Sequence, residues 1–240
     1  MEDTMPMPQS QAYAQSSSLS AVNVYMRKVY QWMCAGLALT SVVAYGVAGS
    51  PEIQQIIFGN SLTMILLIVA QFGLVIALSA AVHKMSAGTA TGLFMLYSAL
   101  TGATLSSIFV VYPVGNIANA FLVTTGTFLA MSVYGTVTKR DLTAMGSFLF
   151  MGLIGIVIAM LVNIFLQSAM MDFVISAIGV LVFTGLTAYD TQKLRAFGEA
   201  APLGDGTAVQ RGAILGALTL YLDFINLFLM LLRLFGNSRD

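Results

Sequence analysis

The fold of this chain is decided by an apolar segment, residues 212–235, which reads GAILGALTLYLDFINLFLMLLRLF. About 20 residues at a rise of 1.5 Å cross the roughly 30 Å hydrocarbon core of a bilayer, so this segment can span a membrane as a helix. The opposite side of that helix is rich in leucine, whereas one face is small, polar and acidic and consists of Gly212, Gly216, Thr219, Asp223 and Asn226. Because such a face should not meet lipid, we predict that this helix sits inside a ring of other helices and that its acid is turned toward a cavity or a partner.

The composition predicts an integral membrane protein whose main partner is the lipid bilayer. The chain has 240 residues, of which 58% are hydrophobic and 8% are charged. Soluble domains carry about 25% charged residues. The net charge is zero and there is no basic run, so no nucleic-acid partner is expected. Cys34 is the single cysteine, which excludes an internal disulfide, and its apolar surroundings predict an inert buried thiol.

Seven apolar segments predict an all-α fold with seven transmembrane helices, because backbone polar groups in lipid must be satisfied within helices. The predicted spans are 29–49, 61–82, 90–111, 116–138, 145–167, 170–192 and 212–235. Residues 1–20 are rich in Ser, Gln, Met and Pro and are expected to be a disordered polar tail. Residues 21–240 form the transmembrane domain, and 21–28 are expected to be a short interfacial helix that leads into the first span.

Basic residues alternate between successive connections. Lys or Arg occurs before the first span and after the second, fourth and sixth, whereas the connections 50–60, 112–115 and 168–169 have neither. Positively charged loops stay in the cytoplasm, so the N-terminus is predicted to be cytoplasmic. Seven crossings would put the C-terminus outside, although Arg233 and Arg239 do not favour that side. A re-entrant or fully enclosed last segment is the alternative.

Of the ten acidic residues, eight lie in connections, in tails or at span ends, which leaves Asp190 and Asp223 within spans. A charged group at the centre of a spanning helix costs about 2.5–3.5 kcal/mol, so two of them suggest a function. The last two spans are antiparallel, so both acids fall in the cytoplasmic half and are expected to face each other. A facing pair would share a proton and titrate as a unit. When ionised it could bind a cation such as Ca²⁺ weakly, because two carboxylates fall short of the usual six to eight oxygens.

Each acid also has a structural interpretation. Asp190 could be a solvated residue near a helix end that pairs with Lys193 at i+3. Asp223 could be protonated and serve only as a hydrogen-bonding group. The supporting polar residues of a functional site would be Thr187, Thr219 and Asn226.

No enzyme and no cofactor are expected. The sequence contains no HExxH, GxSxG or P-loop pattern, and no lysine stands in the middle of a span to form a retinal Schiff base. Two acids within a membrane also occur in intramembrane aspartyl proteases. However, the GxGD context is missing, because Asp190 follows Ala-Tyr and Asp223 follows Tyr-Leu.

Three runs resemble the Bax inhibitor-1 (transmembrane Bax inhibitor motif) family, especially its bacterial inner-membrane branch: YSALTGATLSSIFVVY (97–112), GLTAYDTQKL (185–194) and LTLYLDFINLFLMLLRLFGN (218–237). The resemblance implies seven helices with the last one central, and a pH-sensitive calcium leak channel whose sensor is Asp190 and Asp223. In that family an arginine at the cytoplasmic end of the second span latches the pair shut at higher pH. Here SAAVHKMSAG offers only His83 and Lys84, and lysine cannot form the bidentate clamp of arginine.

Two further function classes stay open. Other relatives regulate partners, so the alternative is a non-conducting regulator that binds another membrane protein, such as a membrane-bound protease complex. A proton-coupled transporter would in addition need a substrate cavity. The resemblance implies the bacterial inner membrane as the location.

Overall fold

The computed structural model describes residues 9–200 and 206–236 of the chain, and these residues form helices joined by short connections. The helices are α1 Gln9–Ala48, α2 Pro51–Phe58, α3 Ser61–Ala81, the short 3-10 helix η1 Val82–Lys84, α4 Ala87–Leu105, α5 Ile108–Val111, α6 Val114–Val137, α7 Thr143–Leu166, α8 Ala169–Ala200 and α9 Gly206–Phe235. Seven stretches within the described residues are long and apolar enough to cross a membrane: 20–48, 61–84, 87–111, 114–137, 143–166, 169–200 and 206–235. The predicted all-α membrane fold is therefore confirmed.

The first and the last two spans are longer than predicted. Residues 21–28 are not a separate interfacial helix, because they are continuous with α1. Of the tail expected at 1–20, residues 1–8 lie outside the described residues and 9–20 form the beginning of α1. Helix α8 continues to Ala200 and α9 begins at Gly206, so both extend beyond the apolar core of their segments. These extensions carry polar side chains that the apolar pattern alone does not include.

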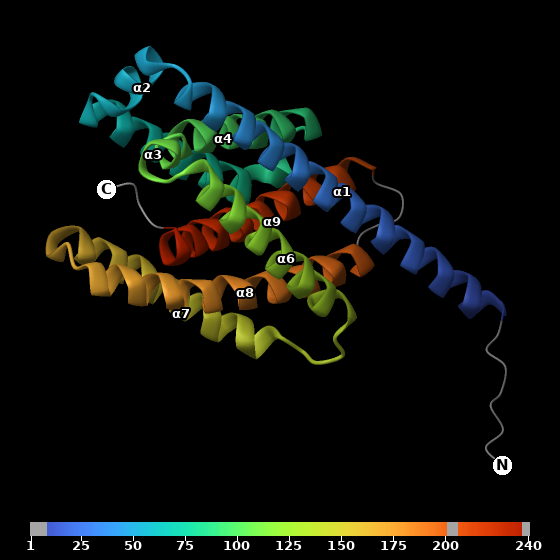
Figure 1. Ribbon diagram of the computed structural model, residues 1–240. Helices are drawn as coiled ribbons and strands as arrows, with labels where there is room; N and C mark the ends of the chain where they lie inside the picture. The colour runs from blue at the N-terminus through green and yellow to red at the C-terminus, as the bar shows by residue number, and fades with distance from the viewer. Residues whose placement is uncertain (1–8, 201–205, 237–240) are drawn as a thin grey trace.

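Helix α9 is the central helix, as predicted. In its most apolar stretch 72% of the residues are buried, against 11–33% in the other six spans. It packs against α8, α1, α6 and α4, while α3 packs on α4 and α7 packs on α8. Figure 1 shows α9 (red) between a group formed by α1, α3 and α4 and a group formed by α7 and α8, with α6 alongside. Its leucine-rich side is covered too, since Leu218 and Leu232 are buried.

Small residues allow the helices around α9 to approach closely. A Cβ atom at Gly135 of α6 would overlap the backbone carbonyl of Ala188 in α8, and one at Gly102 of α4 would meet the Thr40 carbonyl of α1. At the second contact the Thr40 hydroxyl donates to the Ser98 carbonyl at 2.8 Å and is 2.6 Å from the Tyr221 hydroxyl. Polar contacts thus link α1, α4 and α9 inside the bundle.

The thiol of Cys34 is exposed rather than buried, which corrects the prediction from its apolar neighbours. Residue 34 lies in the middle of the first span, so an exposed side chain there meets lipid. Apolar neighbours accompany both core and lipid-facing positions in a membrane protein, and this is why the sequence pattern was misleading.

Candidate functional site

The two acids of the spans lie side by side, one on α8 and one on α9. Asp223 is buried, with 5% of its surface exposed, and Asp190 is half-buried. Their carboxyl groups are close enough for one, when protonated, to donate a hydrogen bond to the other. The structure therefore brings together the two residues that the sequence singled out. Their role in sensing protons stays a prediction.

One oxygen of this pair has no partner within the described residues. Asp223 Oδ2 is buried and accepts no hydrogen bond there. Leaving a buried polar atom unsatisfied costs about 1–3 kcal/mol. Such an atom is a natural place for a proton, a water molecule or a cation to bind.

A cavity of about 210 Å³ opens beside Asp190 and is lined by α1, η1, α8 and α9. Its lining includes Tyr25, His83, Lys193 and Thr219. A water molecule takes about 30 Å³ in the liquid, so this space can hold several. We call this end of the bundle, formed by η1, the α6–α7 connection and the adjoining ends of α8 and α9, the basic end. Of the two acids, Asp190 lines this cavity at the basic end.

The three predicted supporting residues bond mainly to their own helices. The hydroxyl groups of Thr187 and Thr219 donate to the carbonyls of Phe183 and Leu215, at 2.8 and 3.1 Å. The Asn226 amide donates to the Leu222 carbonyl at 2.8 Å. Among these three residues, Thr219 lines the cavity. Its oxygen keeps lone pairs that could face a proton donor or a cation.

The predicted latch residues differ in position. His83 lines the cavity that Asp190 also lines, whereas Lys84 is exposed and is not part of that lining. Among the described residues the ion pair present is Arg195–Glu199, so neither His83 nor Lys84 pairs with a carboxylate there. Lys193, three residues after Asp190 on α8, is a basic residue that lines the same cavity as Asp190.

Sequence reasoning missed the contacts of Arg211, which join the start of α9 to η1 and the residue that follows it. Its guanidinium group donates to the carbonyl of His83 at 2.6 Å and to that of Met85 at 3.3 Å. Carbonyls at the end of a helix lack partners within the helix, and a cation is favourable there. Nothing in the sequence indicated which helix end Arg211 would reach, because the two segments are distant along the chain.

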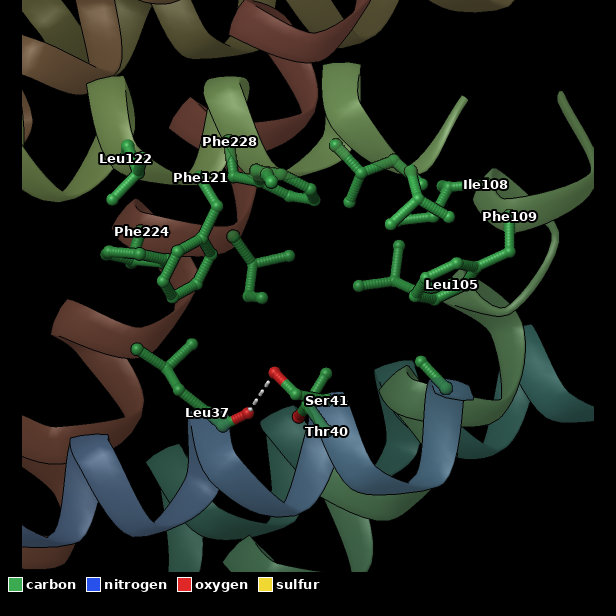
Figure 2. A pocket seen from close by; sticks show the side chains of 15 residues that line it. Leu37, Thr40, Ser41, Leu105, Ile108, Phe109, Phe121, Leu122, Phe224 and Phe228 are labelled. Atoms are coloured by element: carbon green, nitrogen blue, oxygen red, sulfur yellow. Dashed lines mark hydrogen bonds between the residues drawn. The ribbon is translucent and has the colours of Figure 1, made fainter. Parts of the chain in front are cut away.

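A second cavity, of about 420 Å³, faces outward between α1, α6 and α9 and is apolar. Figure 2 shows Leu37, Thr40 and Ser41 of α1 opposite Phe121, Phe224 and Phe228. Its polar side chains are Thr40 and Ser41, and both hydroxyl groups are already hydrogen-bonded, Ser41 to the Leu37 carbonyl at 2.9 Å. This groove suits hydrocarbon and offers an ion no free ligand.

A bundle of seven membrane-spanning helices, closed around a central helix that carries one of two adjacent acids, defines a class of multi-pass membrane protein. The model of the family described as "Inhibitor of apoptosis-promoting Bax1" matches residues 22–240. The chain therefore belongs to the Bax inhibitor-1 family.

Relatives from several bacteria match over most of their length. The chain is 56% identical to the inner membrane protein YbhL of Escherichia coli (strain K12) over 92% of this chain and 94% of that protein. It is 52% identical to an uncharacterized protein of Borreliella burgdorferi, over 91% and 94% of the two chains. It is 38% identical to an uncharacterized membrane protein of Streptococcus pyogenes serotype M1, over 90% and 94%.

Proposed function

We propose that this protein is a pH-sensitive cation leak channel of the bacterial inner membrane, with Ca²⁺ as the transported ion. The observation that carries the proposal is the contact between the carboxyl groups of Asp190 and Asp223 beside a cavity. Two carboxyl groups in contact and away from bulk water share protons, so their joint charge depends on pH. A neutral pair offers little to a cation, and an ionised pair attracts one.

The oxygen ligands fit an ion in transit better than a tightly bound one. Two carboxyl groups and the Thr219 hydroxyl supply fewer oxygens than the six to eight that Ca²⁺ usually takes. The described residues contain no group of three or more His, Cys, Asp and Glu side chains that could hold a metal. Weak binding with water completing the shell is what passage requires, because an ion that binds tightly leaves slowly.

The proposal predicts that Asp223→Asn changes the pH dependence of Ca²⁺ flux, since an amide cannot share the proton and Asp190 then titrates alone. The measurement is Ca²⁺ uptake into proteoliposomes over a pH series. The matched control is Asp141→Asn, which makes the same chemical change outside the spans. The hydroxyl and the backbone N–H of Thr143 donate to the Asp141 carboxylate and hold its pKa below the usual range, so the control also removes a full charge at neutral pH. A pH profile that Asp223→Asn leaves unaltered would overturn the assignment.

The second candidate is a non-conducting regulator, favoured by the family description, which names an inhibitor. Such a protein would bind another membrane protein, for example a membrane-bound protease. Purified protein that passes no ions at any pH, but is isolated with a protease complex, would support this function and exclude the channel.

A further inference from the structure

A large polar cavity lies at the end of the bundle opposite the basic end. It has a volume of about 800 Å³ and is formed by the ends of α7, α8 and α9 together with Tyr112. Asn163, Asp172, Ser176 and Arg233 line it. The proposed ion site, at the other end of α8, uses none of these side chains. The cavity therefore needs an explanation of its own.

Arg233 supplies a positive charge at an end of the bundle whose connecting segments carry none. The connections at this end, 49–60, 112–115 and 167–168, contain no Lys or Arg. Within the described part of the chain, the contact recorded for its guanidinium group is 3.9 Å to the thioether of Met160. Sulfur of this kind is a weak acceptor, and a guanidinium group has five N–H donors. The planar donor fork of Arg233 is available for an anion, and it matches phosphate geometry.

Two further donors point to an anion in the same cavity. Helix α8 begins at Ala169, and the first turn of a helix carries a partial positive charge. The N–H of Met171 already donates to Ser168 Oγ at 3.3 Å, which leaves those of Ala169 and Met170 for an anion. Two turns further along, Ser176 lines the cavity with 1% of its surface exposed. Its hydroxyl oxygen has no hydrogen-bond partner among the described residues. A buried hydroxyl without a partner indicates that a ligand or water completes the site.

Asp172 adds a fixed negative charge to this positive surface. Its Oδ1 accepts from the Asn163 amide at 2.7 Å, and that amide also donates to the Ser168 carbonyl at 3.2 Å. The backbone N–H of Ser168 in turn donates to Asn163 Oδ1 at 3.0 Å. The turn between α7 and α8 is kept short by Gln167, whose φ of 48° is left-handed. Asp172 is thus held at the rim, and no ion pair joins it to Arg233 in the described structure.

The surroundings of the cavity are those of a membrane surface. It lies where three spans end, which is the depth of lipid headgroups. Phe173 at its rim is 58% exposed, and the neighbouring Phe165 is 87% exposed. In a membrane these rings contact acyl chains. A ligand that reaches this cavity from the bilayer therefore carries a charged head and apolar tails.

We propose that this cavity binds the headgroup of a phosphatidylethanolamine-type phospholipid. Arg233, the first turn of α8 and the Ser176 hydroxyl hold the phosphate, and the Asp172 carboxylate accepts from the ammonium group. The separated charges of opposite sign on the protein match the zwitterion of the lipid. The site goes beyond the proposed ion conduction and does not depend on it.

The test is lipid binding to the purified full-length protein, measured by native mass spectrometry after delipidation and titration with defined lipids. Phosphatidylethanolamine should bind one to one, and about tenfold more tightly than diacylglycerol, which has no phosphate. Arg233→Gln should weaken binding of phosphatidylethanolamine and phosphatidylglycerol alike, by about tenfold. Asp172→Asn should weaken the binding of phosphatidylethanolamine but not of phosphatidylglycerol, because phosphatidylglycerol has no amine. The control is Arg27→Gln, which removes an exposed cation at the basic end. It should change the affinity for neither phospholipid.

Three results would overturn the proposal. They are equal binding of diacylglycerol, unchanged affinity in Arg233→Gln, and displacement of the lipid by glycerophosphoethanolamine at equal concentration, which would make this a site for soluble phosphates. If Arg233→Gln does not fold, Ser176→Ala removes a single buried hydroxyl with little change of shape. A fewfold loss of phospholipid affinity in that variant supports the site, and no loss contradicts it.

Discussion

Asp190 and Asp223 do not lie in equivalent surroundings, although they touch. Asp223 belongs to the enclosed helix and is buried, whereas Asp190 borders the cavity that Lys193 also lines. In the proposed channel, protons and cations that arrive from the basic end would reach Asp190 first, and Asp223 would exchange protons through Asp190.

Lys193 should set the pH at which the pair changes charge. Lys193 lines the same cavity as Asp190, and a nearby positive charge favours the ionised form of a carboxyl group, so Lys193→Gln should move the midpoint of the pH-dependent Ca²⁺ flux to higher pH. Lys193→Arg keeps the charge and should leave the midpoint in place. The measurement is the same pH series in proteoliposomes. A midpoint that Lys193→Gln does not move would show that this charge has no part in gating.

At the scale of the helices, glycine contacts fix the distance between α6 and α8. Gly135→Ala would press a methyl group into the backbone of Ala188, whose Cα would lie 3.1 Å away. Because a backbone atom cannot move aside as a side chain can, the expected loss is about 1–3 kcal/mol of unfolding free energy. The measurement is thermal unfolding of the purified protein in detergent.

Gly126 of the same helix is the matched control. A Cβ atom there would meet nothing within 4 Å. Gly126→Ala should change the unfolding free energy by less than about 1 kcal/mol, the size of the difference in helix propensity. Equal effects of the two substitutions would mean that close packing of α6 on α8 does not contribute to stability.

The sequence predicts the spans and the enclosed helix because both depend on local pattern. Length and apolar content identify a span, and the polar face around Asp223 requires protein on that side. The contacts of Arg211 and the exposure of Cys34 could not be predicted from the sequence, for a different reason. They depend on which segments meet in space, and in lipid an apolar neighbourhood does not distinguish the inside of the bundle from its outside.

For the molecule as a whole, the unequal distribution of basic residues predicts that the basic end faces the cytoplasm. This orientation can be tested with variants that carry one introduced cysteine each, in a protein whose native thiol has been removed by Cys34→Ser. Asn60→Cys, in the connection before α3, should react with a membrane-impermeant maleimide in intact cells. Lys139→Cys, in the connection before α7, should react only after permeabilisation. The reverse pattern, or labelling of both sites in intact cells, would contradict the orientation.

The enclosure of α9 has a consequence for biogenesis. α9 is the last of the seven spans along the chain. The other six therefore enter the membrane before it, and the centre of the bundle stays unoccupied until α9 inserts. Exposing the Asp223 carboxyl group to lipid would cost about 2.5–3.5 kcal/mol of free energy if the group is charged. We therefore expect the packing of α9 into the centre of the bundle to be the last step of assembly. Until then the newly made protein exposes its polar interior surface, which a membrane chaperone or a quality-control protease would recognise.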